Sequence, residues 1–485
     1  MKTDIHISTE VIQLFSASEA HIYRLVPCLR SGNELQCYGQ EGKDYSDTLR
    51  EINVLFGFDV SIIPIPLSEL DKMLNMHYRD SGGGISAETN GAGVSAPRTS
   101  GVTSVNDPDF VGSLIEEAVL VRSSDIHIEA YEDRCRVRMR IDGRLLERYV
   151  IDKAHYPALV NRIKILSNLD ISEKRLPQDG RILFERNNRK LDVRVSSLPA
   201  IYGEKIVLRL LTRDMSLLDL KNLGFTPKQY DDYTKSVASP NGLILITGPT
   251  GSGKSTTLYA TLRMLNREDN NVLTIEDPVE YTLEGINQVQ LKEEIGLTFG
   301  NALRTFLRQD PDIIMLGEIR DHDTAEMAVR SSLTGHLLLS TIHTNSAWGS
   351  ITRLADMGVH PWLISDTLAA CVAQRLVRLL CPHCKQEYHI EEGTSSLFGI
   401  DPCRNYFKPT GCGQCHYTGY SGRKAIYEVI RIDNTLSEAI RQNRLNVENY
   451  LKEQQVTTLK DSALSLLAQG QTSLEEILPI LNDGL

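Results

Sequence analysis

The chain of 485 residues contains no apolar run approaching the ~18 residues that suggest a membrane-spanning helix. Its first residues, Met1-Lys2-Thr3-Asp4-Ile5-His6, lack the basic and apolar regions of a secretory signal. The expected compartment is therefore the cytoplasm. In that compartment, nine cysteines favour bound metal or free thiols over disulfides.

An excess of positive charge is also missing. Lys and Arg number 52 against 63 Asp and Glu, which gives a formal charge of −11. This balance argues against a broad nucleic-acid-binding surface, although it leaves room for a local basic channel. Aromatic residues make up 6% of the chain, and no stretch combines aromatic and basic residues into a stacking platform for single strands.

The length exceeds what one core supports, and the composition is that of a globular protein with several domains. Residues 81–107 are rich in Gly, Ser, Ala, Thr and Asn, which predicts a flexible linker. We expect a small α/β docking domain before it and an α+β domain after it. A hinge and a large α/β domain follow. The expected ranges are 1–80, 108–212, 213–224 and 225–485.

The strongest motif matches the phosphate-loop pattern G-x-x-x-x-G-K-[ST] without a mismatch. An apolar run over 242–247 predicts a buried parallel strand before it, and helical periodicity over 256–265 follows it. Loop amides and the helix N-terminus would hold phosphates, Lys254 would neutralise the outer ones, and Ser255 would ligand Mg²⁺. The predicted nucleotide-binding residues are Gly248, Pro249, Thr250, Gly251, Ser252, Gly253, Lys254, Ser255 and Thr256.

Three further apolar runs predict strands that end in polar groups, within 272–280, 312–318 and 336–343. In a parallel sheet such ends meet at one edge, facing a bound nucleotide. Hydrolysis needs a group that orients or deprotonates water, and Glu276 and Glu318 are the candidates. We favour Glu276 as this base and Glu318 as a group acting on Mg²⁺ through water; the sequence leaves the division open. His343 is a further candidate.

Two C-x-x-C pairs, Cys381/Cys384 and Cys412/Cys415, can supply four thiolates to one structural Zn²⁺ in a subdomain at about 380–424. Redox dithiols are the alternative, but a thioredoxin-type motif occurs once and not as a matched pair.

Several arginines in the sequence have two interpretations. On strands of the second domain, or four apart on a predicted helix over 301–308, they form either solvated faces or rigid phosphate-binding groups. The candidates for the second interpretation are Arg194, Arg209, Arg304 and Arg308.

The order of these motifs resembles the secretion-ATPase family of type II secretion and type IV pilus assembly motors. The matching stretches extend over about 108–428. They include 123–129, 175–181, the phosphate loop, an aspartate box at 274–280, 317–321, a histidine box at 334–345 and the four cysteines.

This resemblance implies a RecA-like P-loop ATPase core with a zinc-binding insert, preceded by a PAS-like α+β domain and a small α/β domain. It implies a homo-hexamer that uses ATP, Mg²⁺ and Zn²⁺, in which the four arginines contact nucleotide, some of them in a neighbouring subunit. Residues 1–80 would dock on the cytoplasmic part of an inner-membrane assembly protein, and hydrolysis would move a polytopic platform protein at the inner face of the bacterial inner membrane. Retraction motors generally lack the four-cysteine insert, so assembly is favoured, while type II secretion and type IV pilus remain open. A RecA-like ring motor acting on nucleic acid is the alternative.

Overall fold

The computed structural model describes residues 7–12, 14–15, 17–78, 109–186, 189–211, 218–280, 282–415, 417–444 and 446–482. The predicted linker 81–107 and residues 213–217 of the predicted hinge lie outside the described residues. The chain divides into two compact units, Met1–Thr212 with Thr410–Tyr420 and Arg213–Pro409 with Ser421–Leu485. No helix among the described residues is long and apolar enough to span a membrane.

The amino-terminal part has a three-stranded sheet in the order β1-β2-β3. Strands β1 and β2 form an antiparallel hairpin, and β3 runs parallel to β2. Apolar residues of the strands and helices, including Leu35, Ile52 and Leu70, form one buried cluster. The elements are α1 (Thr9–Ile12), α2 (Ala17–Tyr23), β1 (Leu25–Ser31), β2 (Glu34–Gln40), α3 (Ser46–Phe56), β3 (Asp59–Ile65) and α4 (Leu67–His77).

A six-stranded antiparallel sheet follows, in the order β6-β5-β4-β9-β8-β7. Alternate residues such as Ile126 and Ile128 enter a core with the two helices. Because strand side chains alternate, Asp125, Glu129 and the arginines occupy the opposite face. The elements are α5 (Phe110–Leu120), β4 (Ser123–Ala130), β5 (Arg134–Ile141), β6 (Arg144–Asp152), α6 (Tyr156–Leu166), β7 (Gln178–Arg186), β8 (Arg189–Ala200) and β9 (Gly203–Leu211).

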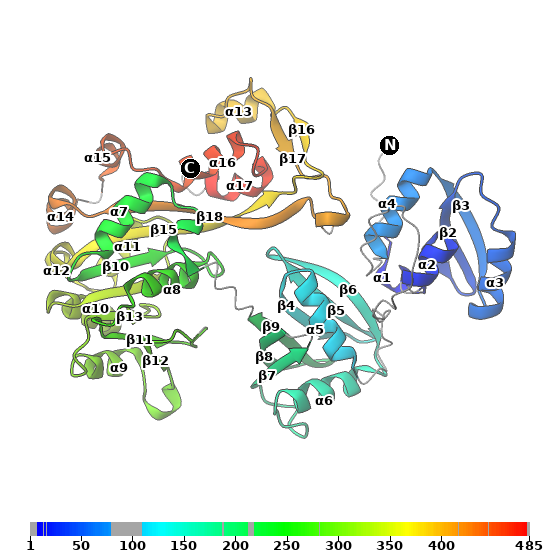
Figure 1. The fold of residues 1–485 in the computed structure, drawn as a ribbon, viewed down its shortest axis with the longest axis horizontal. Helices are drawn as coiled ribbons and strands as arrows, with labels where there is room; N and C mark the ends of the chain where they lie inside the picture. Colours follow the sequence, from blue (N-terminus) through cyan, green and yellow to red (C-terminus); the bar gives the residue numbers. More distant parts are fainter. Residues whose placement is uncertain are drawn as a thin grey trace, which may run out of the picture. The chain divides into compact units, whose positions relative to one another are not determined.

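The second unit is organised around a seven-stranded sheet in the order β12-β11-β13-β14-β10-β15-β18 (Figure 1). The first six strands pair in parallel, so the carboxyl ends of β11, β13, β14 and β10 share one edge. The strands are β10 (Gly242–Thr247), β11 (Val272–Glu276), β12 (Asn287–Gln290), β13 (Ile313–Leu316), β14 (Leu337–Ile342), β15 (Leu368–Leu380) and β18 (Tyr420–Arg431).

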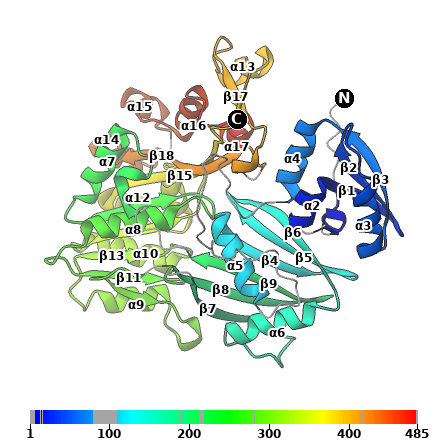
Figure 2. The ribbon, with the colours of Figure 1, turned by 45° about the vertical axis from the view of Figure 1, so that its right-hand side comes forward.

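Helices cover both faces of this sheet (Figure 2). On one face, α7 (Pro227–Val237) and α8 (Lys254–Leu265) pack on Ile244 and Ile246, whereas Leu243 and Leu245 belong to the cluster on the other face. The helices of that second face are α9 (Phe299–Phe306), α10 (His322–Leu333), α11 (Gly349–Asp356), α12 (Pro361–Thr367), α14 (Asn434–Arg441), α15 (Glu448–Glu453), α16 (Leu459–Ala468) and α17 (Leu474–Asn482). A small hairpin and helix, β16 (Gln386–Tyr388), α13 (Glu392–Phe398) and β17 (Tyr406–Lys408), complete the unit.

One helix boundary differs from the expectation. The helix predicted over 301–308 spans Phe299–Phe306, because the Thr298 side chain caps its start at the N–H of Asn301. At its other end Asp310 has a positive φ of 50° and precedes Pro311, which prevents the helix from continuing. Arg308 therefore lies beyond the helix that carries Arg304.

Candidate functional site

The phosphate loop joins β10 to α8, and its glycines are required by its backbone. Gly248, Gly251 and Gly253 have φ values of 151°, 81° and 88°. A Cβ on Gly248 would also lie 2.4 Å from the carbonyl oxygen of Gln374. Gly253 is the N-cap of α8 and supplies no side-chain acceptor, so the first helix amides are available to an anion. The loop thus has the cradle that a phosphate needs.

Polar groups of the loop fit the same ligand. The Oγ of Ser252 is buried and has no hydrogen-bond partner in the described part of the chain. Lys254 Nζ donates to the carbonyl oxygens of Gly248 and Pro249 at 2.8 and 3.1 Å, so its charge is held inside the loop. Burial lowers the pKa of Lys254, against the opposing effect of the Glu318 charge. Ser255 is exposed in the first turn of α8, where its hydroxyl is open to a metal ion.

Glu276 ends β11 and is 4% exposed. Its carboxylate accepts hydrogen bonds from three neutral side chains. Thr274 Oγ1 and Gln288 Nε2 donate to Oε1 at 2.6 and 3.1 Å, and the Tyr259 hydroxyl donates to Oε2. The carboxylate is therefore oriented without a cationic partner in these contacts.

Glu318 follows β13 and instead lies beside the guanidinium of Arg320 and the imidazole of His343. Arg320 donates to Oε1, and His343 Nε2 lies 3.4 Å from Oε2. Burial acts to raise the pKa of Glu318, but the hydrogen bond and charge of Arg320, with the effect of His343, outweigh it and lower the pKa. Gly317 brings this strand end close to Glu276, because a Cβ there would lie 3.4 Å from the Glu276 Cα.

His343 comes directly after β14, and the next residue fastens this loop to β10. The N–H of Thr344 donates to Thr247 Oγ1 at 2.7 Å, and the two threonine hydroxyls are also 2.7 Å apart. The structure therefore brings together Lys254, Glu276, Glu318 and His343 at the predicted edge of the sheet.

Two residues of β15 beside the loop were missed at the sequence level. Gln374 Nε2 donates to the carbonyl oxygen of Ser252 at 2.9 Å. The neighbouring Arg375 is 8% exposed and donates to the carbonyl oxygen of Asn345 at 3.0 Å, which links β15 to the loop after β14. The available signal was this adjacent polar pair inside a mostly apolar strand, 368–380.

The predicted nucleotide-contacting arginines make contacts within their own regions. Arg194 and Arg209 are register partners on β8 and β9, and Arg209 Nε lies 2.9 Å from Asp125 Oδ1. Arg304 and Arg308 are exposed, and Arg308 donates to the carbonyl oxygen of Arg304 at 3.1 Å. Their role toward nucleotide stays a prediction.

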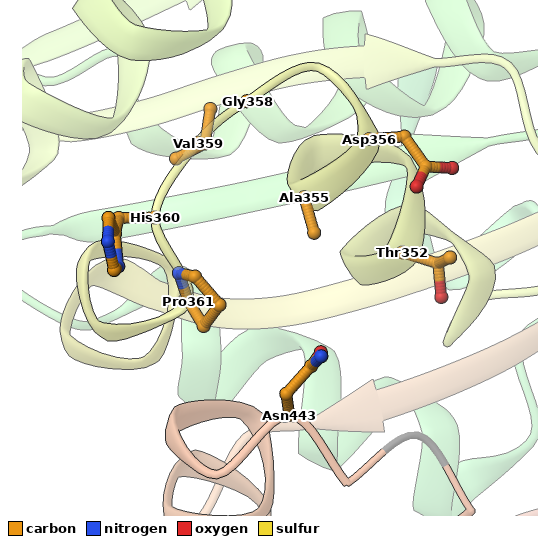
Figure 3. Close-up of a pocket in the computed structure, with 8 residues that line it drawn as sticks. All are labelled: Thr352, Ala355, Asp356, Gly358, Val359, His360, Pro361 and Asn443. Atoms are coloured by element: carbon orange, nitrogen blue, oxygen red, sulfur yellow. The ribbon is translucent and has the colours of Figure 1, made fainter.

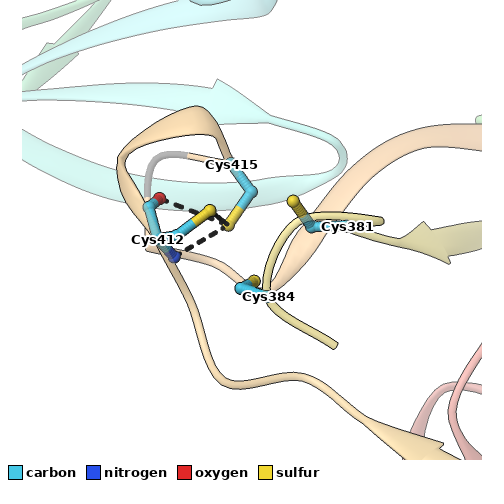
Figure 4. Close-up of side chains that lie close together, drawn as sticks. All are labelled: Cys381, Cys384, Cys412 and Cys415. Carbon is cyan, nitrogen blue, oxygen red and sulfur yellow. Dashed lines mark hydrogen bonds between the residues drawn. The ribbon is translucent and has the colours of Figure 1, made fainter. Parts of the chain in front are cut away.

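The four predicted cysteine ligands lie together (Figure 4). The sulfur atoms of Cys381, Cys384, Cys412 and Cys415 all lie within 4.8 Å of one another, and those of Cys412 and Cys415 are 3.8 Å apart. Tetrahedral Zn²⁺ with Zn–S bonds of about 2.3 Å separates its sulfurs by about 3.8 Å. The backbone N–H of Gly419 donates to Cys415 Sγ at 3.3 Å, which stabilises a thiolate. This donor set fits a structural zinc ion.

A separate surface hollow of about 410 Å³ lies beside α11 and the start of α12 (Figure 3). Asp356 and His360 are among its lining residues. This hollow shares no residue with the phosphate loop or with the strand ends, so it is not part of the candidate nucleotide site.

Residues 107–479 match the family described as type II/IV secretion system protein. The chain is 46% identical over 378 residues to type II secretion system protein E of Aeromonas hydrophila, covering 77% of this chain and 75% of that one. It is 45% identical over 380 residues to type II secretion system ATPase E of Vibrio cholerae, with the same two coverages.

Solved structures agree on the fold. The pilus retraction motor PilT with bound ADP is 25% identical, with a TM-score of 0.53 over 76% of this chain and 95% of that one. The ATPase DotB of Legionella pneumophila is 23% identical, with a TM-score of 0.58 over 78% and 96%. The predicted RecA-like fold class and the family resemblance are confirmed. The chain belongs to the type II/IV secretion system protein family and is one of its ATP hydrolases, acting in secretion and pilus assembly.

Proposed function

We propose that this ATPase works as a homo-hexamer that powers assembly of a pseudopilus in type II secretion. The observation that carries the proposal is a phosphate loop with two strand-end glutamates, in a chain about 45% identical to type II secretion system E proteins over 77% of its length. This similarity favours secretion over the nucleic-acid ring motor. The test is Mg²⁺-dependent ATP hydrolysis by the purified hexamer, with Lys254→Ala as the inactive variant and DNA at low salt as a stimulator that should have no effect.

The roles of the site residues follow from their surroundings. Loop amides and Lys254 bind the phosphates, and Ser255 with Glu318 would hold Mg²⁺, Glu318 through water. When bound there, Mg²⁺ would supply positive charge to offset the charge that develops on the phosphates. Because Arg320, with the effect of His343, lowers the pKa of Glu318, this carboxylate is a weak proton acceptor. Glu276, held by neutral donors, is the better base for the attacking water.

The remaining assignments concern the assembly. Arg194, Arg209, Arg304 and Arg308 would contact nucleotide, some of them in a neighbouring subunit. Residues 1–80 would dock on the cytoplasmic part of an inner-membrane assembly protein, and the motor would act on a polytopic platform protein from the cytoplasmic side. Removing 1–80 should abolish recruitment to membranes in cells that carry the secretion system while sparing basal ATP hydrolysis.

Zinc would stabilise the segment around the four cysteines. Cys412→Ser or chelation should loosen residues 380–424, measured by hydrogen exchange. Cys403→Ser is the matched control, because Cys403 is an exposed free cysteine outside the cluster. Native protein without bound zinc by metal analysis would contradict the assignment.

A further inference from the structure

Tyr259 joins three segments of the nucleotide site. It lies on α8, the helix that begins at the phosphate loop, and it is 1% exposed. Its hydroxyl donates to Oε2 of Glu276 and accepts a hydrogen bond from the N–H of Glu280 at 3.1 Å. One hydroxyl therefore ties the phosphate-loop helix to the end of β11 and to the segment that follows it.

The contacts of Glu276 leave little freedom to its carboxylate. A carboxylate has about four acceptor positions, two on each oxygen. Thr274 and Gln288 both donate to Oε1, and Tyr259 donates to Oε2. Among the described residues, these contacts leave one acceptor position, and it is on Oε2. The oxygen that Tyr259 contacts is thus the one with room for the proton of a water molecule.

We propose that Tyr259 is a positioning residue for ATP hydrolysis, which fixes Oε2 of Glu276 relative to the phosphate loop so that this oxygen meets the attacking water. The inference rests on the proposed role of Glu276 as the base. The other two donors lie on β11 and β12. Tyr259 is therefore the donor that fixes the position of the carboxylate relative to α8, the helix that follows the phosphate loop. Rates depend steeply on such alignment, because a misplacement of about 1 Å costs up to about 100-fold.

The test compares Tyr259→Phe with Tyr233→Phe in the full chain. Tyr233 is a matched control, because it is 0% exposed and its hydroxyl lies 2.7 Å from Thr261 Oγ1 on the same helix α8, rather than on a carboxylate. For Tyr259→Phe we expect kcat to fall at least about tenfold, while KM and the Kd of ATP change less than about twofold. Tyr233→Phe should keep kcat within about twofold. Thermal unfolding of both variants without nucleotide reports whether each is folded.

A double variant separates positioning from a general structural effect. If Tyr259 acts through Glu276, Tyr259→Phe adds no further loss to Glu276→Gln. A multiplicative loss, or equal kcat for the two tyrosine variants, overturns the positioning role and leaves the proposed base intact. Wild-type kcat in Glu276→Gln instead overturns both. Should Tyr259→Phe fail to fold, Gln288→Leu removes another donor to Glu276 from a partly exposed position, and full kcat in that variant would contradict the dependence on carboxylate orientation.

Discussion

The ends of β11 and β13 are neighbours with the same residue type, and they differ in what surrounds the carboxylate. Glu276 accepts hydrogen bonds from neutral groups, whereas Glu318 lies between Arg320 and His343. Neutral donors orient a carboxylate, while a cation also stabilises its charged form by direct charge attraction and so weakens the group as a base. One edge of one sheet can therefore provide both a base and a carboxylate that helps to hold a metal ion, because the surroundings of the two glutamates differ.

The largest expected effect comes from Glu276→Gln. The amide retains the volume of the side chain but cannot take a proton, so kcat should fall by about 100- to 10,000-fold while the KM for ATP changes little. Steady-state ATP hydrolysis at saturating Mg²⁺ measures this loss. A fall of less than about threefold would remove the distinction between the two strand ends.

Glu318→Gln should have a different signature. If Glu318 holds Mg²⁺ through water, the Mg²⁺ concentration for half-maximal activity should rise about 10- to 100-fold, as for other outer-sphere partners of a metal. High Mg²⁺ should then restore most of kcat. A loss as large as that of Glu276→Gln at saturating Mg²⁺ would exchange the two assignments.

The sequence alone does not predict this difference between the surroundings of Glu276 and Glu318. The strand 242–247 has the bounds that its apolar run predicts, because a continuous apolar pattern defines it. The strand ends themselves were also predictable, since carboxyl ends of parallel strands share an edge. Tyr259 and Gln288 reach Glu276 from other segments, and His343 reaches Glu318 from the end of β14, so only the folded chain brings these groups to the carboxylates.

The candidate arginines show a second reason why prediction from the sequence was incomplete. Arg194 and Arg209 lie on strands, as expected, and on the face opposite the core of the six-stranded sheet. Arg308 was expected on the helix of Arg304, and the left-handed Asp310 before Pro311 ends that helix first. Local backbone chemistry, rather than periodicity, decided this boundary.

His343→Ala should have a smaller effect. The imidazole is about half exposed and lies 3.4 Å from Glu318. Contacts of this kind contribute about 0.2–1 kcal/mol, so activity should fall no more than about fivefold. The loss should shrink in the Glu318→Gln background if His343 acts through that carboxylate. An equal loss in both backgrounds would assign His343 a separate contact with nucleotide.

The smallest expected effect is that of Arg320→Ala on stability. In the folded protein the pKa of Glu318 lies below the ordinary 4.5, so the pair stabilises the fold above that pH and loses this contribution as pH falls through the folded-state value. Arg320 is 54% exposed, so screening limits the stabilisation to at most about 1 kcal/mol, or a shift of about 1–3 °C in Tm at pH 7.

The shift should disappear as the pH falls below 4.5, and thermal unfolding of wild type and variant across this range measures it. Because Arg320 also lies 3.8 Å from Asp277, the same pair of measurements in the Glu318→Gln background isolates the contribution of Glu318. Arg267→Ala, which breaks an exposed ion pair with Asp269, is the control and should shift Tm by less than about 1 °C. An Arg320→Ala penalty that persists unchanged in the Glu318→Gln background would show that Arg320 does not set the environment of Glu318, and the contrast between the two strand ends would then rest on Glu276 alone.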